Sequence, residues 1–162
     1  MSRNFIVAMF SVFAWCLAIG VGVASEAHTN EEAIAMVNRV QEKFKRDGPE
    51  ATFKAVSDKT TGEFHNGELY PFIYDLDGIN VAHGARPALV GKSLISLKDQ
   101  DGKYLMKEMI EIANGPGSGW IHYMFPNPFT GKIEQKSTYV ERMGDYLVGV
   151  GIWREGTAVN RQ

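Results

Sequence analysis

Three basic side chains in the second half of the chain have the chemistry and the placement to hold a negatively charged ligand. His83 ends a predicted strand, Arg86 follows it in a long connection, and Lys136 lies within a later strand. Hydrogen bonds from such groups to a carboxylate are charge-assisted and belong to the stronger class of hydrogen bonds. The three residues therefore predict a site in which one small carboxylate is bound.

Aromatic residues near these cations complete the predicted pocket. Tyr123 and Tyr139 each offer a phenolic donor, whereas Trp120 and Tyr70 offer apolar walls. A mostly apolar lining with a few polar groups is typical of small-molecule sites. Alternation along the strand places Tyr139 on the face opposite Lys136, and the charge of Lys136 makes it the preferred member of the two.

Each basic residue also has a purely structural explanation. Lys136 suits a solvated strand position because its neighbours are polar, and Arg86 suits the tip of a loop. The His83 ring suits a role in which it only bonds the backbone of the loop that follows. Whether Tyr123 and Lys136 share a face depends on the register of the hairpin between them, since a slip of one residue reverses the faces. The sequence leaves these alternatives open.

Motifs of enzymes and metal sites fail on spacing. A calcium loop that includes Asp99 would place Leu97 at the first ligand position, where an oxygen is needed, so Asp99 is assigned to a turn and helix cap. The glycine-rich residues 115–119 lead into a strand and lack the helix N-terminus that binds phosphate. The four histidines have no zinc-like spacing, and Ser93 lacks the setting of a hydrolase nucleophile. No catalytic residue, metal ligand or cofactor is predicted.

The elements that must position these side chains begin with helices. Thr29 or Asn30 is a suitable N-cap for a helix with one apolar face, which Asp47-Gly48 should end. Pro49 suits the first position of a second, short helix. Residues 60–67 are expected to form a loop. A further helix is predicted over residues 102–114, with Gly115 placed to end it.

Five segments have the composition of strands. They are residues 69–76, 79–83, 120–125, 132–142 and 146–153. Asp77-Gly78 is the two-residue type of turn that joins the first two strands as a hairpin. The short connections between the last three strands predict antiparallel neighbours. Residues 84–101 are irregular, and so long a connection in a compact domain is typical of a functional loop.

The N-terminal residues predict export. Arg3 precedes an apolar run over residues 5–23, and small residues follow near positions 24–27. This arrangement is that of a secretory signal peptide over residues 1–25, with cleavage between residues 24 and 27 and a periplasmic or secreted product. The alternative is an uncleaved anchor in the inner membrane, because roughly 17 to 25 apolar residues can span a bilayer. Contact with the membrane is expected only in that second case.

Size, cysteine content and charge limit the rest of the chain. Residues 26–162 are enough for one domain with its own core. The only cysteine, Cys16, lies in the predicted signal peptide, so no disulfide is available to the mature domain. The chain carries 17 basic and 19 acidic residues, and the basic ones are scattered. A nucleic-acid partner is not predicted, because such proteins need a basic patch.

Short motifs in series resemble a known family. They are Gly67-Glu68-Leu69-Tyr70, Asp77-Gly78, Ala82-His83, Leu89-Val90-Gly91-Lys92, Asp101-Gly102-Lys103, Gly119-Trp120, Tyr123, Asn127-Pro128, Lys136, Tyr139-Val140 and Gly149-Val150-Gly151. In this order, from about residue 31 to 153, they look like the single Cache domain, an extracytoplasmic sensor module. The resemblance implies an α+β, PAS-like fold. Its five-stranded antiparallel sheet should have a long N-terminal helix behind it and a helix and loop in front.

The resemblance also implies a function. Family members commonly bind small organic acids, so residues 26–162 are expected to form an exported, non-catalytic sensor domain for a small carboxylate, in signal transduction such as chemotaxis. Only nine residues follow Trp153, which favours a free-standing member that acts through a membrane receptor or a histidine kinase. One alternative is a structural or partner-docking module of a signalling complex. Another is a small exported enzyme that uses His83 as acid or base.

Overall fold

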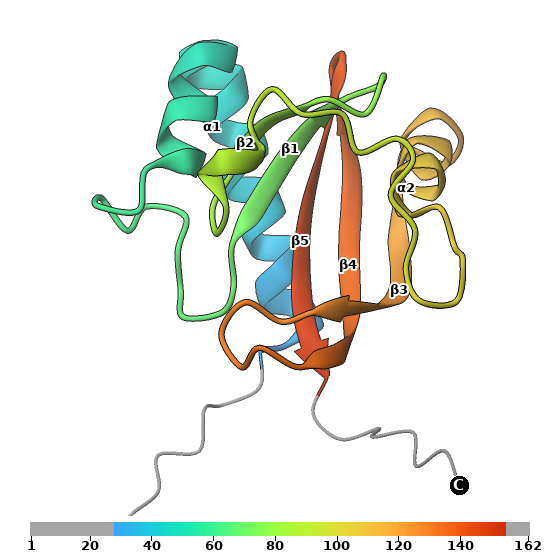
Figure 1. The fold of residues 1–162 in the computed structure, drawn as a ribbon. Helices are drawn as coiled ribbons and strands as arrows, with labels where there is room; N and C mark the ends of the chain where they lie inside the picture. The colour runs from blue at the N-terminus through green and yellow to red at the C-terminus, as the bar shows by residue number, and fades with distance from the viewer. Residues whose placement is uncertain (1–27, 155–162) are drawn as a thin grey trace, which may run out of the picture.

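The computed structural model describes residues 28–154, and the expected signal peptide, residues 1–25, lies outside this range. Five strands form one antiparallel sheet in the order β2-β1-β5-β4-β3 (Figure 1). The strands are β1 (Pro71–Asp75), β2 (Asn80–His83), β3 (Ser118–Pro126), β4 (Ile133–Met143) and β5 (Tyr146–Arg154). The helices are α1 (Asn30–Ser57), the 3-10 turn η1 (Pro87–Leu89) and α2 (Leu105–Asn114). The predicted α+β fold is therefore confirmed.

Helix α1 begins at a capping box and contains one break. The Thr29 hydroxyl accepts a hydrogen bond from the Glu32 amide, and the Glu32 carboxylate accepts one from the Thr29 amide. Gly48 leaves the helical path with φ 80° and ψ 176°, and Pro49 restarts it. Glycine adopts this backbone without the strain that a Cβ would cause. The prediction of two helical stretches that meet at Asp47-Gly48 is confirmed.

The hairpin of β1 and β2 closes at the predicted Asp77-Gly78 turn. The Asp75 carboxylate accepts hydrogen bonds from the amides of Asp77 and Ile79. Gly78 has a φ of 82°, in the region that favours glycine. The turn brings β2 back beside β1. His83, at the end of β2, therefore lies near the start of β1, which Tyr70 directly precedes.

Helix α2 begins at Leu105, after the predicted start at residue 102. The Asp99 carboxylate accepts hydrogen bonds from the amides of Asp101 and Lys103, which folds residues 99–103 into a turn. Side chains of Asp often compete for the backbone in this way. The prediction of a turn at Asp99 is confirmed, but that of a helix cap there is wrong, because Tyr104 holds the N-cap position of α2 without a side-chain hydrogen bond. Gly115 caps the end of the helix as expected.

Alternation along the strands gives the sheet two apolar faces. The back face packs against α1 in a cluster that contains Val37 and Val148, and Figure 1 shows α1 behind the sheet. The front face packs against α2 in a second cluster that contains Met106 and Leu147. We call residues 84–104 together with α2 the front layer. Within residues 28–154, no helix combines the length and the apolar character needed to cross a bilayer.

Candidate ligand-binding site

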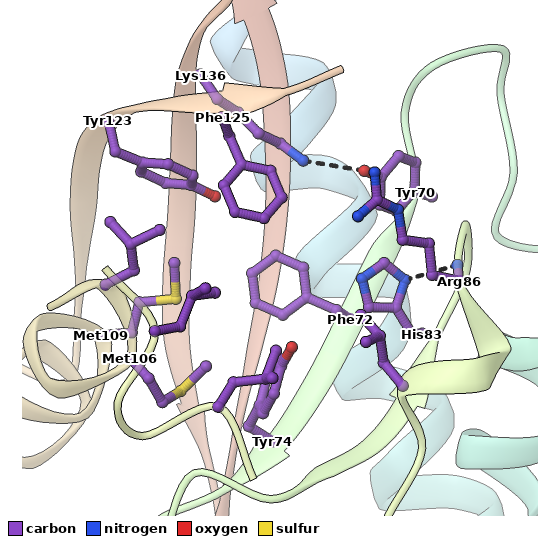
Figure 2. Close-up of a pocket in the computed structure, with 14 residues that line it drawn as sticks. Tyr70, Phe72, Tyr74, His83, Arg86, Met106, Met109, Tyr123, Phe125 and Lys136 are labelled. Atoms are coloured by element: carbon purple, nitrogen blue, oxygen red, sulfur yellow. Dashed lines mark hydrogen bonds between the residues drawn. The ribbon is translucent and has the colours of Figure 1, made fainter. Parts of the chain in front are cut away.

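A cavity lies between the front face of the sheet and the front layer, and we call it the front pocket (Figure 2). Its volume is about 50 Å³, roughly enough for three to five water-sized groups, because one water needs about 10–15 Å³. The apolar lining residues are Phe72, Tyr74, Leu89, Leu94, Leu97, Leu105, Met106, Met109 and Phe125, and the polar ones are Tyr70, His83, Arg86, Tyr123 and Lys136. The lining thus contains cations but no carboxylate.

Lys136 extends from β4 into the front pocket and is almost wholly buried. It is 3% exposed, and its Nζ donates a hydrogen bond of 3.1 Å to the Tyr70 hydroxyl. The Nζ also lies 4.4 Å from the centre of the Trp153 ring and 4.7 Å from that of the Tyr70 ring, and such contacts stabilise a desolvated ammonium. Burial, with a smaller effect of nearby Arg86, lowers the pKa of Lys136 to about 7.

Two glycines of β5 leave room for the side chains at the floor of the pocket. A Cβ on Gly151 would lie 2.1 Å from Lys136 Cε and 2.6 Å from Thr138 Oγ1. A Cβ on Gly149 would lie 2.4 Å from the Phe72 ring. Glycine in a strand often marks such a close approach. The ammonium of Lys136 therefore occupies space that a larger residue at position 151 would remove.

His83 combines the structural role and the pocket position that the sequence left as alternatives. Its Nδ1 accepts hydrogen bonds from the amides of Ala85, at 3.2 Å, and Arg86, at 3.0 Å. Burial, together with nearby Lys136, Arg86 and Lys59, lowers the pKa of His83 to about 3. A neutral imidazole whose Nδ1 accepts carries its proton on Nε2. Figure 2 shows this second nitrogen on the side of Phe72, where it offers a donor to the pocket.

Arg86 lies at the end of the loop that His83 holds, and it occupies the N-cap position of η1 without a side-chain capping hydrogen bond. Its side chain is half-buried, and Figure 2 shows the guanidinium near the Tyr70 hydroxyl. Among residues 28–154, no carboxylate lies within ion-pair distance of Arg86 or Lys136. The site therefore holds Arg86 and, below about pH 7, a charged Lys136 that have no ion-pair partner in this part of the chain, and Glu68 acts on Lys136 only as a weaker, longer-range charge.

Tyr123 and Lys136 share the front face, because they are direct partners in the β3–β4 ladder. The Tyr123 hydroxyl lies 2.9 Å from Thr138 Oγ1, with which it shares a hydrogen bond. Burial raises the pKa of Tyr123 well above its ordinary value and that of Tyr70 to about 12. Both phenols thus stay protonated near neutral pH and act as donors or acceptors without adding negative charge to the site.

The chemistry of the pocket is that of an anion site with an apolar end. Lys136, Arg86 and the His83 Nε2–H provide donors on one side, while Met106 and Met109 of α2 provide an apolar wall on the other. An acid with a short hydrocarbon tail matches both parts. Residues 28–154 contain no group of three His, Cys, Asp or Glu side chains that could hold a metal ion.

Trp120 and Tyr139 are not where a pocket role requires them. They are partners across β3 and β4 with ring centres 5.4 Å apart, and both pack against the back cluster with α1. The expectation that Trp120 forms a pocket wall and Tyr139 a donor is corrected accordingly. The physical reason is the two-residue period of a strand, which puts Trp120 on the face opposite Tyr123. The other five predicted residues line the front pocket.

Several pocket residues were not expected from the sequence. Phe72 and Tyr74 alternate in β1 with the buried Ile73, a pattern that identifies two faces but not which one carries a cavity. Gly149 and Gly151 gave a spacing signal, because two glycines at every second position of a strand leave one face bare. Trp153 follows them on the same face and contacts Lys136.

The chain is similar in sequence to known proteins. The sequence profile of the Cache domain matches residues 27–161 of the chain. The sensor histidine kinase MctS of Rhizobium johnstonii is 28% identical over 123 residues, which are 75% of this chain and 26% of MctS. The methyl-accepting chemotaxis protein McpP of Pseudomonas putida is 27% identical over 86 residues, 52% of this chain and 16% of McpP. The chain therefore spans about a quarter or less of these two curated relatives.

Solved structures share the fold. A methyl-accepting chemotaxis protein from Vibrio parahaemolyticus has a TM-score of 0.66 at 24% identity, over 77% of this chain and 88% of that one. A Cache chemosensory domain whose structure concerns carboxylic acid recognition has a TM-score of 0.60 at 22% identity, again over 77% and 88% of the two chains. These likenesses show the PAS-like arrangement of helix and sheet.

Proposed function

The chain belongs to the Cache family of sensor domains, and from this premise we propose that it binds a short organic acid in the front pocket without catalysing a reaction. The observation that carries the proposal is the state of Lys136. Its ammonium is 3% exposed, yet among residues 28–154 no carboxylate pairs with it. Burial of an unpaired charge is unfavourable, and a carboxylate ligand would supply the missing partner.

The proposed pose follows from the donors and the shape. The ligand carboxylate lies between Lys136 and Arg86, within reach of the His83 Nε2–H and the Tyr70 hydroxyl. Its tail points toward Met106. A volume of about 50 Å³ suits an acid of roughly four or five heavy atoms, such as acetate or propionate. At no more than about 1.5 kcal/mol per heavy atom, such acids should bind with Kd values in roughly the micromolar range or weaker.

The same proposal covers location and partners. Residues 1–25 direct export, residues 26–162 form the sensor domain, and a membrane receptor or histidine kinase reads its state. The histidine kinase MctS and the chemotaxis protein McpP, which match this chain over part of their lengths, support a signalling context. A relative by fold, described for carboxylic acid recognition, supports the ligand class.

A thermal-unfolding screen tests the proposal. Purified protein is unfolded, dialysed and refolded to remove any ligand, then heated with acetate, propionate, butyrate, lactate, pyruvate or succinate. An acid present at 100 times its Kd should stabilise the fold by about 2.7 kcal/mol. We expect a shift with the short monocarboxylates and a smaller one, or none, with succinate, whose second carboxylate would enter the apolar end.

The alternatives give different results. A docking module would show no shift with any acid and would retain a protein partner. An enzyme would consume the acid, and its turnover would disappear in His83→Ala. Either result would contradict the proposal that this domain is a non-catalytic binder.

A further inference from the structure

The segment that carries Arg86 is held by hydrogen bonds on both sides of its backbone. We call residues 83–86 the Arg86 segment. All four of its amides donate hydrogen bonds: Ala85 and Arg86 to His83 Nδ1, Gly84 to the Pro71 carbonyl over 2.9 Å, and His83 to the Ser57 hydroxyl over 3.3 Å. Two of its carbonyls accept bonds from side chains outside the pocket, and these bonds come from the connection between α1 and β1.

His65 and Lys59 provide those bonds. His65 Nε2 lies 3.0 Å from the Gly84 carbonyl, and Lys59 Nζ lies 2.8 Å from the Ala85 carbonyl. The Lys59 bond is exposed, and exposed pairs of this kind contribute little because water competes for both partners. The His65 bond is partly buried, and Gly84 itself is buried. His65 is therefore the stronger of the two anchors.

The packing around Gly84 makes this anchor specific. A Cβ at Gly84 would lie 2.8 Å from Tyr70 Cβ and 3.1 Å from His65 Nε2. The Arg86 segment therefore passes directly over Tyr70 and against the His65 ring. Tyr70 in turn accepts the hydrogen bond of Lys136. A shift of the Gly84 carbonyl would move Arg86 and His83 relative to Tyr70 and Lys136.

We propose that His65 is a positioning residue for the ligand, which acts by holding the Gly84 carbonyl so that Arg86 and His83 face the front pocket. The inference rests on the proposed function, and it concerns a residue that does not line the pocket. The Nδ1 of His65 is buried and has no hydrogen-bond partner among residues 28–154. An unpaired buried acceptor opposes stability, so the ring is poorly explained as a stabilising residue alone.

Isothermal titration with propionate tests the proposal on three single variants of the mature protein. His65→Leu should weaken binding by about 3- to 10-fold, the effect of one lost hydrogen bond. His65→Gln, whose amide can also donate to the Gly84 carbonyl, should retain most of the affinity. His122→Leu changes an exposed histidine of β3 in the same way and should bind as the wild type does. Thermal unfolding without ligand checks that each variant is folded.

The decisive comparison is His65→Leu in an Arg86→Met background. If His65 acts through Arg86, adding His65→Leu to Arg86→Met causes little further loss of propionate affinity beyond that of Arg86→Met alone. A full additional loss, or wild-type affinity in His65→Leu alone, overturns the inference. Failure of the wild type to bind any acid of the thermal screen overturns the proposed function as well, so the two failures are distinguishable.

Discussion

Lys136 and Tyr70 meet in the front pocket through a hydrogen bond of 3.1 Å, although 66 positions separate them in the chain. The bond leaves the ammonium with a neutral partner. Tyr70 has a pKa raised to about 12, mainly by burial, and so does not supply negative charge near neutral pH. A buried cation that is bonded only to neutral groups is unfavourable, and an anionic ligand would stabilise it through a charge-assisted hydrogen bond.

Removal of this charge should abolish most of the binding without loss of the fold. We expect Lys136→Met to weaken propionate binding by at least about tenfold, equivalent to the 1.5–3 kcal/mol of a hydrogen bond to a charged group. The free energy of unfolding of the ligand-free variant should stay the same or rise, since an unpaired buried charge is removed. Lys132→Met, which changes an exposed lysine beside the same strand, is the matched control. Equal affinity of both variants would falsify the assignment of Lys136.

The pH dependence of binding should report the charge of Lys136. Burial, with nearby Arg86, lowers the pKa of Lys136 to about 7, and a bound carboxylate should raise it again. Binding above about pH 7 therefore takes up a proton, and affinity should fall by at most about tenfold for each further pH unit. Titrations at pH 8 in buffers with different ionisation enthalpies should reveal this proton, whereas titrations at pH 6 should not. His83, with a pKa of about 3, stays neutral over this range.

The stability of the ligand-free protein should follow a related trend. The pKa of Lys136 is about 7 in the fold and near its ordinary value of 10.5 in the unfolded chain. Between these values the unfolded chain binds more protons, so the contribution of Lys136 to the free energy of unfolding rises with pH. Its unfavourable effect is complete below about pH 7. The difference between wild type and Lys136→Met should thus shrink from pH 7 to pH 9, and a constant difference would argue against a neutralised amine.

Gly151 should be needed for the position of Lys136. In Gly151→Ala the new Cβ would overlap Lys136 Cε and Thr138 Oγ1, at 2.1 Å and 2.6 Å. We expect a loss of about 1–3 kcal/mol in stability, as for other overpacked sites, together with weaker propionate binding. Gly119→Ala is the control, because its Cβ would meet Ile112 at 3.2 Å and no pocket residue. Unchanged ligand affinity in folded Gly151→Ala would show that Lys136 can act from another position.

Met106 should limit the length of the ligand. Met106→Ala enlarges the apolar end of the front pocket, so longer acids such as butyrate and valerate should gain roughly fourfold in relative affinity for each added CH₂. Met143 is equally buried but belongs to the back cluster. Both alanine variants should lose about 2–5 kcal/mol of stability, yet only Met106→Ala should change the preference among acids. If both variants showed the same preference among acids, the ligand tail would not lie against Met106.

Local patterns were enough to predict the elements of the fold. The Asp77-Gly78 turn, the break at Gly48 and the cap at Gly115 depend on the backbone freedom or hydrogen bonding of single residues. They therefore appear in the structure where the sequence predicts them. Alternation also separates Tyr139 from Lys136, as expected, and the same rule would have excluded Trp120 from the face of Tyr123.

The environment of Lys136 could not be predicted in this way. Its sequence neighbours Glu134 and Gln135 are polar and suggest a solvated strand, yet Lys136 is 3% exposed. Burial here depends on the front layer and on Tyr70, which are remote in the chain, and on the β5 glycines that leave space beneath the side chain.

The sequence by itself determined the five strands, the helices, the main turns and the presence of basic residues near strand ends, because these follow from short-range periodicity and from single-residue backbone preferences. Only the tertiary structure decided which residues meet. The β3–β4 register pairs Tyr123 with Lys136, and the loop after β2 brings Arg86 beside them. Register and loop path are set by packing between distant segments. A shift of one residue in register would turn the side chains of the buried cation site to the opposite face of the sheet.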